Sequence, residues 1–182
     1  MGTSRPYYLS NMCSSIIKWQ PKSVLDIGVG FGKNGFLCRE YTDIWHGRYG
    51  KENRRTLIHG VEIFEHYIER HHKEIYDEIF IGNIVEIINS VNKYDIIIAT
   101  DVIEHLKKEE AVEVLSKIKE KSHHAIVTIP INVGTRGAMK QQGLPINHHE
   151  AHISGEWTLE ELLLYGKVDK FNNHTWYIEM GN

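Results

Sequence analysis

An acidic residue followed by closely spaced glycines is the feature of the sequence best suited to bind a ligand. Within residues 24–35, an apolar run carries Asp26 and leads into Gly28, Gly30 and Gly32. Glycine tolerates positive φ and lets backbone N–H groups approach a ligand without a Cβ in the way. A helix expected directly after the glycines would turn its positive N-terminal end toward the same ligand. The segment therefore predicts a pocket that holds a nucleoside cofactor.

Two classes of cofactor could use this turn. Residues 30–35, G-F-G-K-N-G, fit the G-x-G-x-x-G pattern of dinucleotide-binding turns, in which the helix end faces a pyrophosphate. Asp26 argues against a dinucleotide, because its carboxylate would face the pyrophosphate with like charge in a poorly screened pocket. An acid at this place suits a cationic ligand such as S-adenosylmethionine (SAM), which carries an ammonium and a sulfonium group.

Two further signals favour SAM. Glu62 ends a predicted strand, where an acid can accept hydrogen bonds from both hydroxyls of a ribose, and residues 94–106 read Y-D-I-I-I-A-T-D-V-I-E-H-L. The glycine segment resembles motif I of the class I SAM-dependent methyltransferases, and residues 94–106 resemble their motif IV. The chain is therefore identified as a member of that family over nearly its whole length.

The resemblance implies SAM as cofactor, S-adenosylhomocysteine (SAH) as its product, and a set of residues that holds them. That set is Asp26, Gly28, Gly30, Gly32, Glu62, Ile63, Asn83, Ile84, Thr100, Asp101, Val102 and His105. Thr100 and Asp101 would border the methionine part, and Val102 would pack near the sulfonium. Asn83 departs from the family, which often has an acid there; its amide oxygen can accept the adenine amino proton, or it caps the next helix. His105 is either a wall of the pocket or a structural histidine.

Residues 147–158, N-H-H-E-A-H-I-S-G-E-W-T, hold the densest polar chemistry of the chain. Methyl transfer from a sulfonium is an in-line displacement, and histidine suits the role of general base because its pKa lies near working pH. The loop resembles an N-x-x-x-x-H-x-S-x-x-W region of small methyltransferases that act on sugars and other polar metabolites. That resemblance implies His149 or His152, with His148 as a further candidate, as the base and Trp157 as a wall of the acceptor site.

Two other interpretations of this loop stay open. His148 and His152 are spaced i, i+4 with Glu150 between them, a set that could bind a divalent metal. Because the H-E-x-x-H spacing is missing, we expect no metal. Alternatively, the histidines are solvated while Ser154 or Thr158 caps the next helix.

Basic residues in two other segments could contact an anionic acceptor. Residues 4–8, S-R-P-Y-Y, are candidates for a lid over the cofactor and include Arg5. Arg136 and Lys140 stand in the long irregular stretch that follows Pro130. Irregular stretches of this length inside a compact domain usually carry function.

Apolar runs alternate with helical patterns along the chain, which predicts an α/β fold with a mostly parallel, doubly wound, Rossmann-like sheet. We expect strands at 23–28, 56–62, 78–81, 94–100 and 125–129, helices at 9–19, 32–41, 64–74, 84–91, 107–121 and 158–165, a loop at 42–55, and a hairpin of 167–171 with 175–180. The resemblance implies the strand order 3-2-1-4-5-7-6 with an antiparallel C-terminal hairpin.

Size and charge limit the class of protein. The chain has 182 residues and a net charge of −3, which fits one domain, 1–182, without the broad basic field that binds nucleic acid. No stretch approaches the roughly 18 apolar residues of a membrane span, and the N-terminus lacks an apolar signal core. We therefore expect a cytoplasmic protein with a small-molecule substrate, no nucleic acid and no membrane; the sequence specifies no oligomeric state.

The hypothesis from the sequence is a SAM-dependent methyltransferase acting on an oxygen, or less favourably a nitrogen, of a small polar metabolite such as a sugar or sugar conjugate. One alternative is a methyltransferase-like module that binds SAM, or serves as a partner subunit, without turnover of its own. A NAD-dependent oxidoreductase is disfavoured because the chain leaves little room for a substrate domain. The motifs also do not reject a variant that cleaves SAM or transfers its carboxypropyl group.

Overall fold

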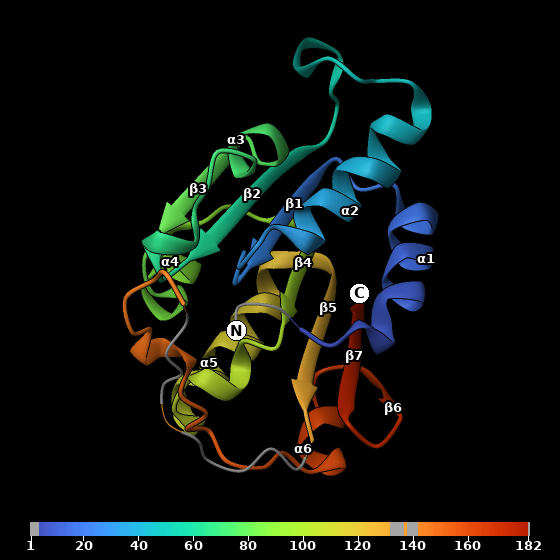
Figure 1. Cartoon of the computed structure of the whole chain (residues 1–182). Coiled ribbons are helices and arrows are strands. Elements are labelled where there is room, and N and C mark those ends of the chain that lie inside the picture. The colour runs from blue at the N-terminus through green and yellow to red at the C-terminus, as the bar shows by residue number, and fades with distance from the viewer. Residues whose placement is uncertain (1–3, 132–136, 138–141, 182) are drawn as a thin grey trace.

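A sheet built from the strands of both halves of the chain forms the centre of the molecule (Figure 1). The structure is a computed structural model that describes residues 4–131, 137 and 142–181. Its strands are β1 Ser23–Ile27, β2 Leu57–Glu62, β3 Glu78–Ile81, β4 Tyr94–Thr100, β5 Ser122–Pro130, β6 Lys167–Phe171 and β7 Thr175–Gly181. Within these residues the sheet has seven strands in the order β3-β2-β1-β4-β5-β7-β6. The first five run parallel, and β7 pairs antiparallel with β5 and β6, which confirms the predicted fold class and strand order.

Helices cover both faces of the sheet (Figure 1). One face packs against α1 Leu9–Trp19, α2 Lys33–Thr42 and α3 His72–Ile75, and the other against α4 Ile84–Ser90, α5 Lys108–Lys121 and α6 Leu159–Leu163. In β4, Ile96 and Ile98 belong to the first core, while Ile97 and Ala99 belong to the second. This alternation explains why the strand reads as a continuous apolar run, since a parallel sheet is buried on both faces.

The predicted helix at 64–74 is wrong. The structure has a 3₁₀ turn at Glu65–Tyr67 and the short helix α3 in its place. The backbone N–H of Glu69 donates to Nδ1 of His72 at 2.9 Å instead of to a helical carbonyl. Such local bonds from side chain to backbone compete with helix formation, and the buried ring of His72 holds this one in place.

The other predicted elements are present, several of them with the predicted bounds and the rest with shifted ends. The predicted loop at 42–55 contains two 3₁₀ turns, Ile44–His46 and Lys51–Asn53. Strand β5 begins at Ser122, earlier than predicted, because it pairs with Tyr94 of β4 there. The helix predicted at 158–165 is the shorter α6, which Thr158 caps by accepting from the N–H of Glu161 at 3.2 Å.

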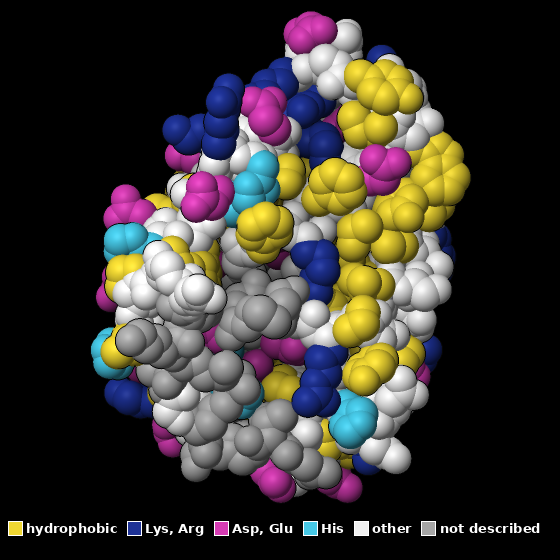
Figure 2. All heavy atoms as spheres, in the orientation of Figure 1, with side chains coloured by type: hydrophobic (Ala, Val, Ile, Leu, Met, Phe, Trp, Pro, Cys, Tyr) yellow, Lys and Arg dark blue, Asp and Glu magenta, His cyan; other side chains and the backbone are white. Residues whose placement is uncertain are grey.

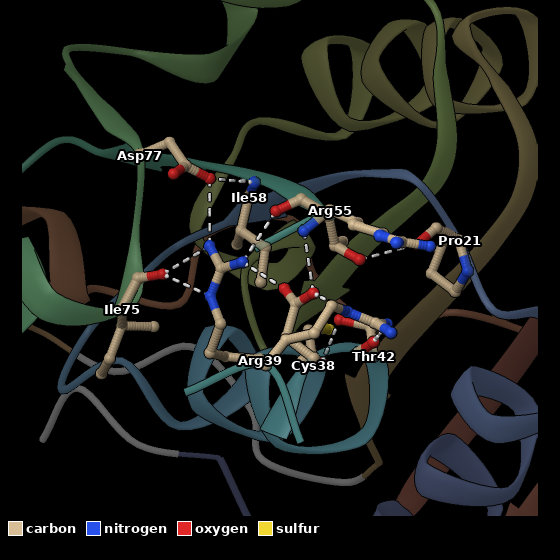
Figure 3. A network of polar contacts seen from close by, with 11 residues as sticks. Pro21, Cys38, Arg39, Thr42, Arg55, Ile58, Ile75 and Asp77 are labelled. Atoms are coloured by element: carbon tan, nitrogen blue, oxygen red, sulfur yellow. Dashed lines mark hydrogen bonds and ion pairs between the residues drawn. The ribbon is translucent and has the colours of Figure 1, made fainter. Parts of the chain in front are cut away.

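A buried ion network fixes the start of β2 to α2 (Figure 3). The guanidinium of Arg39 donates to Asp43 at 2.6 Å, to Asp77 at 3.0 Å and to the backbone carbonyls of Ile75 and Thr56. Arg39 is 4% exposed and Asp43 is 0% exposed. Burial acts to raise the pKa of Asp43, yet its hydrogen bonds with the Arg55 N–H, Arg48 and Arg39 hold it below its usual value. The network therefore keeps the long connection between α2 and β2 against the sheet.

Hydrophobic side chains gather in a band on the side of the molecule that carries α1 and α2 (Figure 2). Among exposed residues of this part of the chain are Ile17, Phe36, Trp45 and Tyr49, of which Tyr49 is 70% exposed. As for membranes, none of the described helices combines the length and apolar character needed to cross one.

Candidate active site

A cavity of about 480 Å³ lies beyond the carboxyl ends of β1, β2 and β4. Strand β1 sits between β2 and β4, so the connections from β1 and from β4 leave in opposite directions at this place. Open α/β sheets bind ligands at such a topological switch point. Of the residues implied by the motif resemblance, those lining the cavity are Gly28, Gly30, Glu62, Ile63, Asn83, Ile84, Thr100, Asp101, Val102 and His105. The fold thus brings together residues that are distant in the sequence.

The glycine turn brings backbone close to the turn that follows β4. Gly28 has φ +77°, and a Cβ built on it would stand 2.4 Å from Cγ2 of Val102. A larger residue at this place would therefore be strained and would displace Val102 from the cavity wall. Asp101, the residue before Val102, also has a positive φ, of 54°. Backbone in this sparsely populated region is often found at ligand sites.

Asp26 lies beneath the cavity and does not line it. Its carboxylate is 0% exposed and accepts from the Tyr76 hydroxyl at 2.6 Å, from Asn34 Nδ2 at 3.1 Å and from the Gly35 N–H at 3.2 Å. Burial raises its pKa to about 6, although these hydrogen bonds act in the opposite direction. We expected this carboxylate to face the ligand, whereas in the structure it holds the glycine turn to the start of α2. Gly32, at the N-cap of α2, is likewise absent from the cavity wall.

Two residues that the sequence analysis did not single out support the turn from behind. The ring of Tyr76 fills the space beside Gly35, where a Cβ built on that glycine would lie 2.3 Å from Cζ of Tyr76. The ring of His72 is buried, and its Nε2 lies 3.0 Å from the carbonyl oxygen of Gly30. Because a carbonyl oxygen only accepts, Nε2 carries the proton. The available signal was a pair of aromatic residues four positions apart, His72 near the end of a segment predicted as a helix and Tyr76 just after it.

The predicted ribose acid is on the cavity wall. Glu62 accepts from the Gly30 N–H at 2.9 Å and from the Phe64 N–H at 2.9 Å, one bond to each oxygen. Each carboxylate oxygen has a further lone pair, so Glu62 can still accept two hydroxyls. Burial raises the pKa of its carboxyl. Asn83, next to it on the wall, caps α4 by accepting from the Val85 N–H at 3.0 Å, so the N-cap interpretation is correct.

The N-terminal segment closes one side of the cavity. Lys33 donates from Nζ to the carbonyl of Ser4 at 2.8 Å and to its hydroxyl at 2.6 Å. The Ser4 hydroxyl lies 3.3 Å from Thr100 Oγ1, which also accepts from Asn34 at 2.9 Å. Ser4 and Arg5 line the cavity. Of the predicted lid residues, Tyr8 is instead packed in the core at 0% exposure.

The polar loop also contributes to the cavity wall. Asn147, His149, Glu150 and His152 all line the cavity. The Tyr67 hydroxyl donates to Glu150 at 2.8 Å, which ties the loop to the turn after β2. His149 and His152 therefore line the same cavity as Glu62.

Three loop residues are placed differently from the expectation. His148 is exposed and is not part of the cavity wall. Trp157 does not form a wall either: it packs in the core, 6% exposed, with Lys108 Nζ 3.4 Å from its ring centroid. Among the described residues, His152 is grouped with Glu104 and His105 as possible metal ligands, in place of His148 and Glu150. Arg136 and Lys140 lie outside the described residues.

Solved structures share this fold at low sequence identity. A protein from Pyrococcus horikoshii OT3, PH0226, is 17% identical with a TM-score of 0.64, covering 97% of this chain and 89% of its own. The N-terminal domain of EvdMO1, solved in the presence of SAH and D-fucose, is 12% identical with a TM-score of 0.61, over 93% and 80% of the two chains. A SAM-dependent methyltransferase from Archaeoglobus fulgidus is 20% identical with a TM-score of 0.53, over 71% and 55%. The chain thus has the fold of the class I SAM-dependent methyltransferases.

Comparison of the sequence with curated proteins and with models of protein families identifies the family of the chain. No curated protein sequence matches the chain. A family model described as mitochondrial small ribosomal subunit Rsm22 matches residues 6–142, well over half of the sequence, including the glycine turn and the exit of β4. On that match, the chain belongs to the Rsm22 family.

Proposed function

We propose that the protein binds SAM in this cavity and transfers its methyl group to an oxygen, or less favourably a nitrogen, of a small polar molecule. The observation that carries the proposal is one cavity whose wall includes the glycine turn and the buried acid Glu62 as well as His149 and His152. A nucleoside held by Glu62 would share this cavity with Thr100, Val102 and the loop of His149 and His152. The acceptor and the cofactor would then meet inside one enclosure.

The residues on the wall fit an adenosyl ligand. Glu62 can accept hydrogen bonds from both ribose hydroxyls, and Asn83 stands beside it for the adenine edge. Gly28 leaves room where a Cβ would collide with Val102. Asp26 acts here as a positioning residue, since it holds the turn and does not touch the cavity.

Catalysis by this arrangement rests on positioning. When bound, SAM would supply an electrophilic methyl group on its sulfonium. The loop at 147–153 would hold the acceptor in line with that methyl group, and such alignment provides much of the acceleration of a displacement. His149 or His152 would accept the proton of a hydroxyl or amine acceptor, a step that contributes typically 10²–10⁴-fold.

Turnover is the test of this proposal. Purified protein is incubated with SAM and a panel of sugars, sugar conjugates and polar amines, and SAH is quantified. We expect SAH to form with at least one hydroxyl acceptor, and His149→Ala or His152→Ala to lower kcat while SAM affinity stays within threefold. His123→Ala removes an exposed histidine at the start of β5 and is the matched control. SAH formation at equal rates with and without every acceptor would contradict acceptor methylation.

The family match favours a second candidate function, a SAM-binding module that assembles with a small ribosomal subunit. The matching family is described by that assembly, and the exposed Phe31, Phe36, Trp45 and Tyr49 supply apolar surface of the kind that partner proteins cover. Co-sedimentation with purified small ribosomal subunits, weakened by Trp45→Ser, would favour the module. Absence of co-sedimentation together with turnover on a free small molecule would favour the enzyme.

A further inference from the structure

Three potential metal ligands converge on the wall of the cavity. Glu104, His105 and His152 each offer one ligand atom, and these atoms lie within 4.8 Å of one another. Glu104 and His105 belong to the 3₁₀ turn Ile103–His105 after β4, whereas His152 comes from the loop before α6. All three residues line the cavity. A tertiary contact, not a sequence spacing, therefore creates the group.

The backbone fixes the two segments against each other. The carbonyl oxygen of Glu104 accepts from the N–H of Ile153 at 2.8 Å and from that of Ser154 at 3.2 Å. The rings of His105 and His152 meet edge to face, with centroids 4.9 Å apart. Glu104 is 3% exposed and His152 is 6% exposed. The side chains are thus held by packing, as a site that keeps one geometry requires.

The hydrogen bond of His105 orients its ring for a ligand role. Its Nδ1 lies 3.0 Å from the carbonyl oxygen of Ala151. Because a carbonyl oxygen can only accept, Nδ1 carries the proton, and a neutral ring then has its lone pair on Nε2. Nε2 is the nitrogen that faces the group, 3.7 Å from Oε1 of Glu104. Histidine ligands of metals are commonly oriented by such a carbonyl partner.

We propose that Glu104, His105 and His152 bind a divalent cation that holds the methyl acceptor through two neighbouring oxygens; this rests on the proposed methyl transfer. Two imidazoles and one carboxylate suit a first-row metal such as Mn²⁺, Fe²⁺, Co²⁺ or Zn²⁺. Three protein ligands leave about three positions of an octahedral ion open. The cavity supplies the space in which an acceptor would fill two of them.

The metal gives the reaction a defined acceptor class. A cation lowers the pKa of a bound hydroxyl, so the oxygen attacks the methyl carbon as an alkoxide. The carbon–sulfur bond then breaks with its electron pair left on sulfur, and the hydroxyl proton passes to His149 or to water. The acceptor inferred is therefore a molecule with a hydroxyl beside a second oxygen, as in a vicinal diol. A lone alcohol or amine would bind by one position only.

Direct titration with Mn²⁺ tests the site without any need for turnover. The chelator-treated full chain is titrated with Mn²⁺, and free Mn²⁺ is followed by electron paramagnetic resonance. We expect one saturable site per chain, weakened at least tenfold in His152→Gln and in His105→Gln, and unchanged in His123→Ala. The bound ion should also enhance the relaxation of water protons, because open coordination positions hold exchanging water.

SAH binding, measured on the same samples, separates this inference from the proposed function and reports that each variant is folded. Wild-type protein that binds SAH but shows no saturable site for Mn²⁺, Co²⁺ or Zn²⁺ would overturn the metal site alone. Equal Mn²⁺ affinity in wild type and in both ligand variants would do the same. Mn²⁺ binding without SAH binding would keep the metal site and remove the methyltransferase proposal. Tight Mn²⁺ binding with no relaxation enhancement would show a closed structural site and exclude acceptor binding to the ion.

Discussion

The Tyr76 hydroxyl donates a 2.6 Å hydrogen bond to the fully buried carboxylate of Asp26. The bond joins Tyr76, the C-cap residue that follows α3, to Asp26 of β1, beneath the glycine turn of the cavity. The ring of Tyr76 also fills the space beside Gly35, where a Cβ would stand 2.3 Å from it. Tyr76, which does not line the cavity, therefore supports the glycine turn that does.

Removal of that hydroxyl should loosen the turn. Tyr76→Phe leaves the buried Asp26 with one partner fewer, and a lost hydrogen bond to a buried charged group costs about 1–3 kcal/mol. We expect the free energy of unfolding in urea to fall by that amount and SAM affinity to weaken. Tyr49→Phe, at a residue 70% exposed, should change stability by less than about 0.5 kcal/mol. Equal stability of the two variants would show that the bond does not support the turn.

The burial of Asp26 predicts a pH dependence of stability. Burial raises its pKa from 3.8 to about 6, so the folded state binds this proton more tightly than the unfolded state. The stabilising contribution of the proton is present at low pH and is lost as pH rises through about 6. Relative to Asp26→Asn, the wild-type free energy of unfolding should fall by about 1 kcal/mol between pH 5 and pH 7. Urea titrations at both pH values that show a constant difference would contradict the shift.

Gly28 should tolerate no side chain. Gly28→Ala places a Cβ 2.4 Å from Val102 Cγ2 at a positive φ of 77°, and we expect at least a tenfold loss of SAM affinity. Gly47→Ala is a closely matched control, because Gly47 has the same φ of 77° and nothing within 4 Å of a built Cβ. Both variants share a backbone strain of about 1–2 kcal/mol, so calorimetric titration isolates the effect of Val102. Comparable SAM affinity in the two variants would place the cofactor elsewhere.

The ion network behind β2 should be essential to folding. Arg39→Met leaves the carboxylate of Asp43, which is 0% exposed, without its 2.6 Å partner. Because Asp43 keeps Arg48 at 2.9 Å, we expect a loss of about 3 kcal/mol, the lower end of the cost of breaking a buried pair. Arg55→Met keeps the backbone N–H that donates to Asp43 at 2.9 Å and removes only an exposed side chain. Thermal unfolding should therefore separate the variants clearly, and a small effect of Arg39→Met would show that water replaces the guanidinium.

Much of the fold could be predicted from the sequence because hydrophobic periodicity and turn residues act locally. The apolar run of β4 and the glycine turn before α2 each identify their element without knowledge of the rest. The error at 64–74 arose because the apolar residues there allow a helix, whereas the tertiary contact of His72 with Gly30 decides the backbone. Sequence periodicity carries no information on such a contact.

The candidate site was predictable only where it follows the strand ends. Glu62, Thr100 and Val102 are on the cavity wall because strand ends meet at the switch point. The depth of Asp26 was not predictable, since its neighbour Tyr76 comes from a distant segment. For the same reason, the grouping of His152 with residues after β4 appears in the structure alone.

Calorimetric titration of the purified chain with SAM, SAH and NAD⁺ tests the central claim most directly. We predict one site per chain for SAM and SAH, weakened at least tenfold in Gly28→Ala, and no heat of binding with NAD⁺. Tight NAD⁺ binding with no response to SAM or SAH would contradict the account.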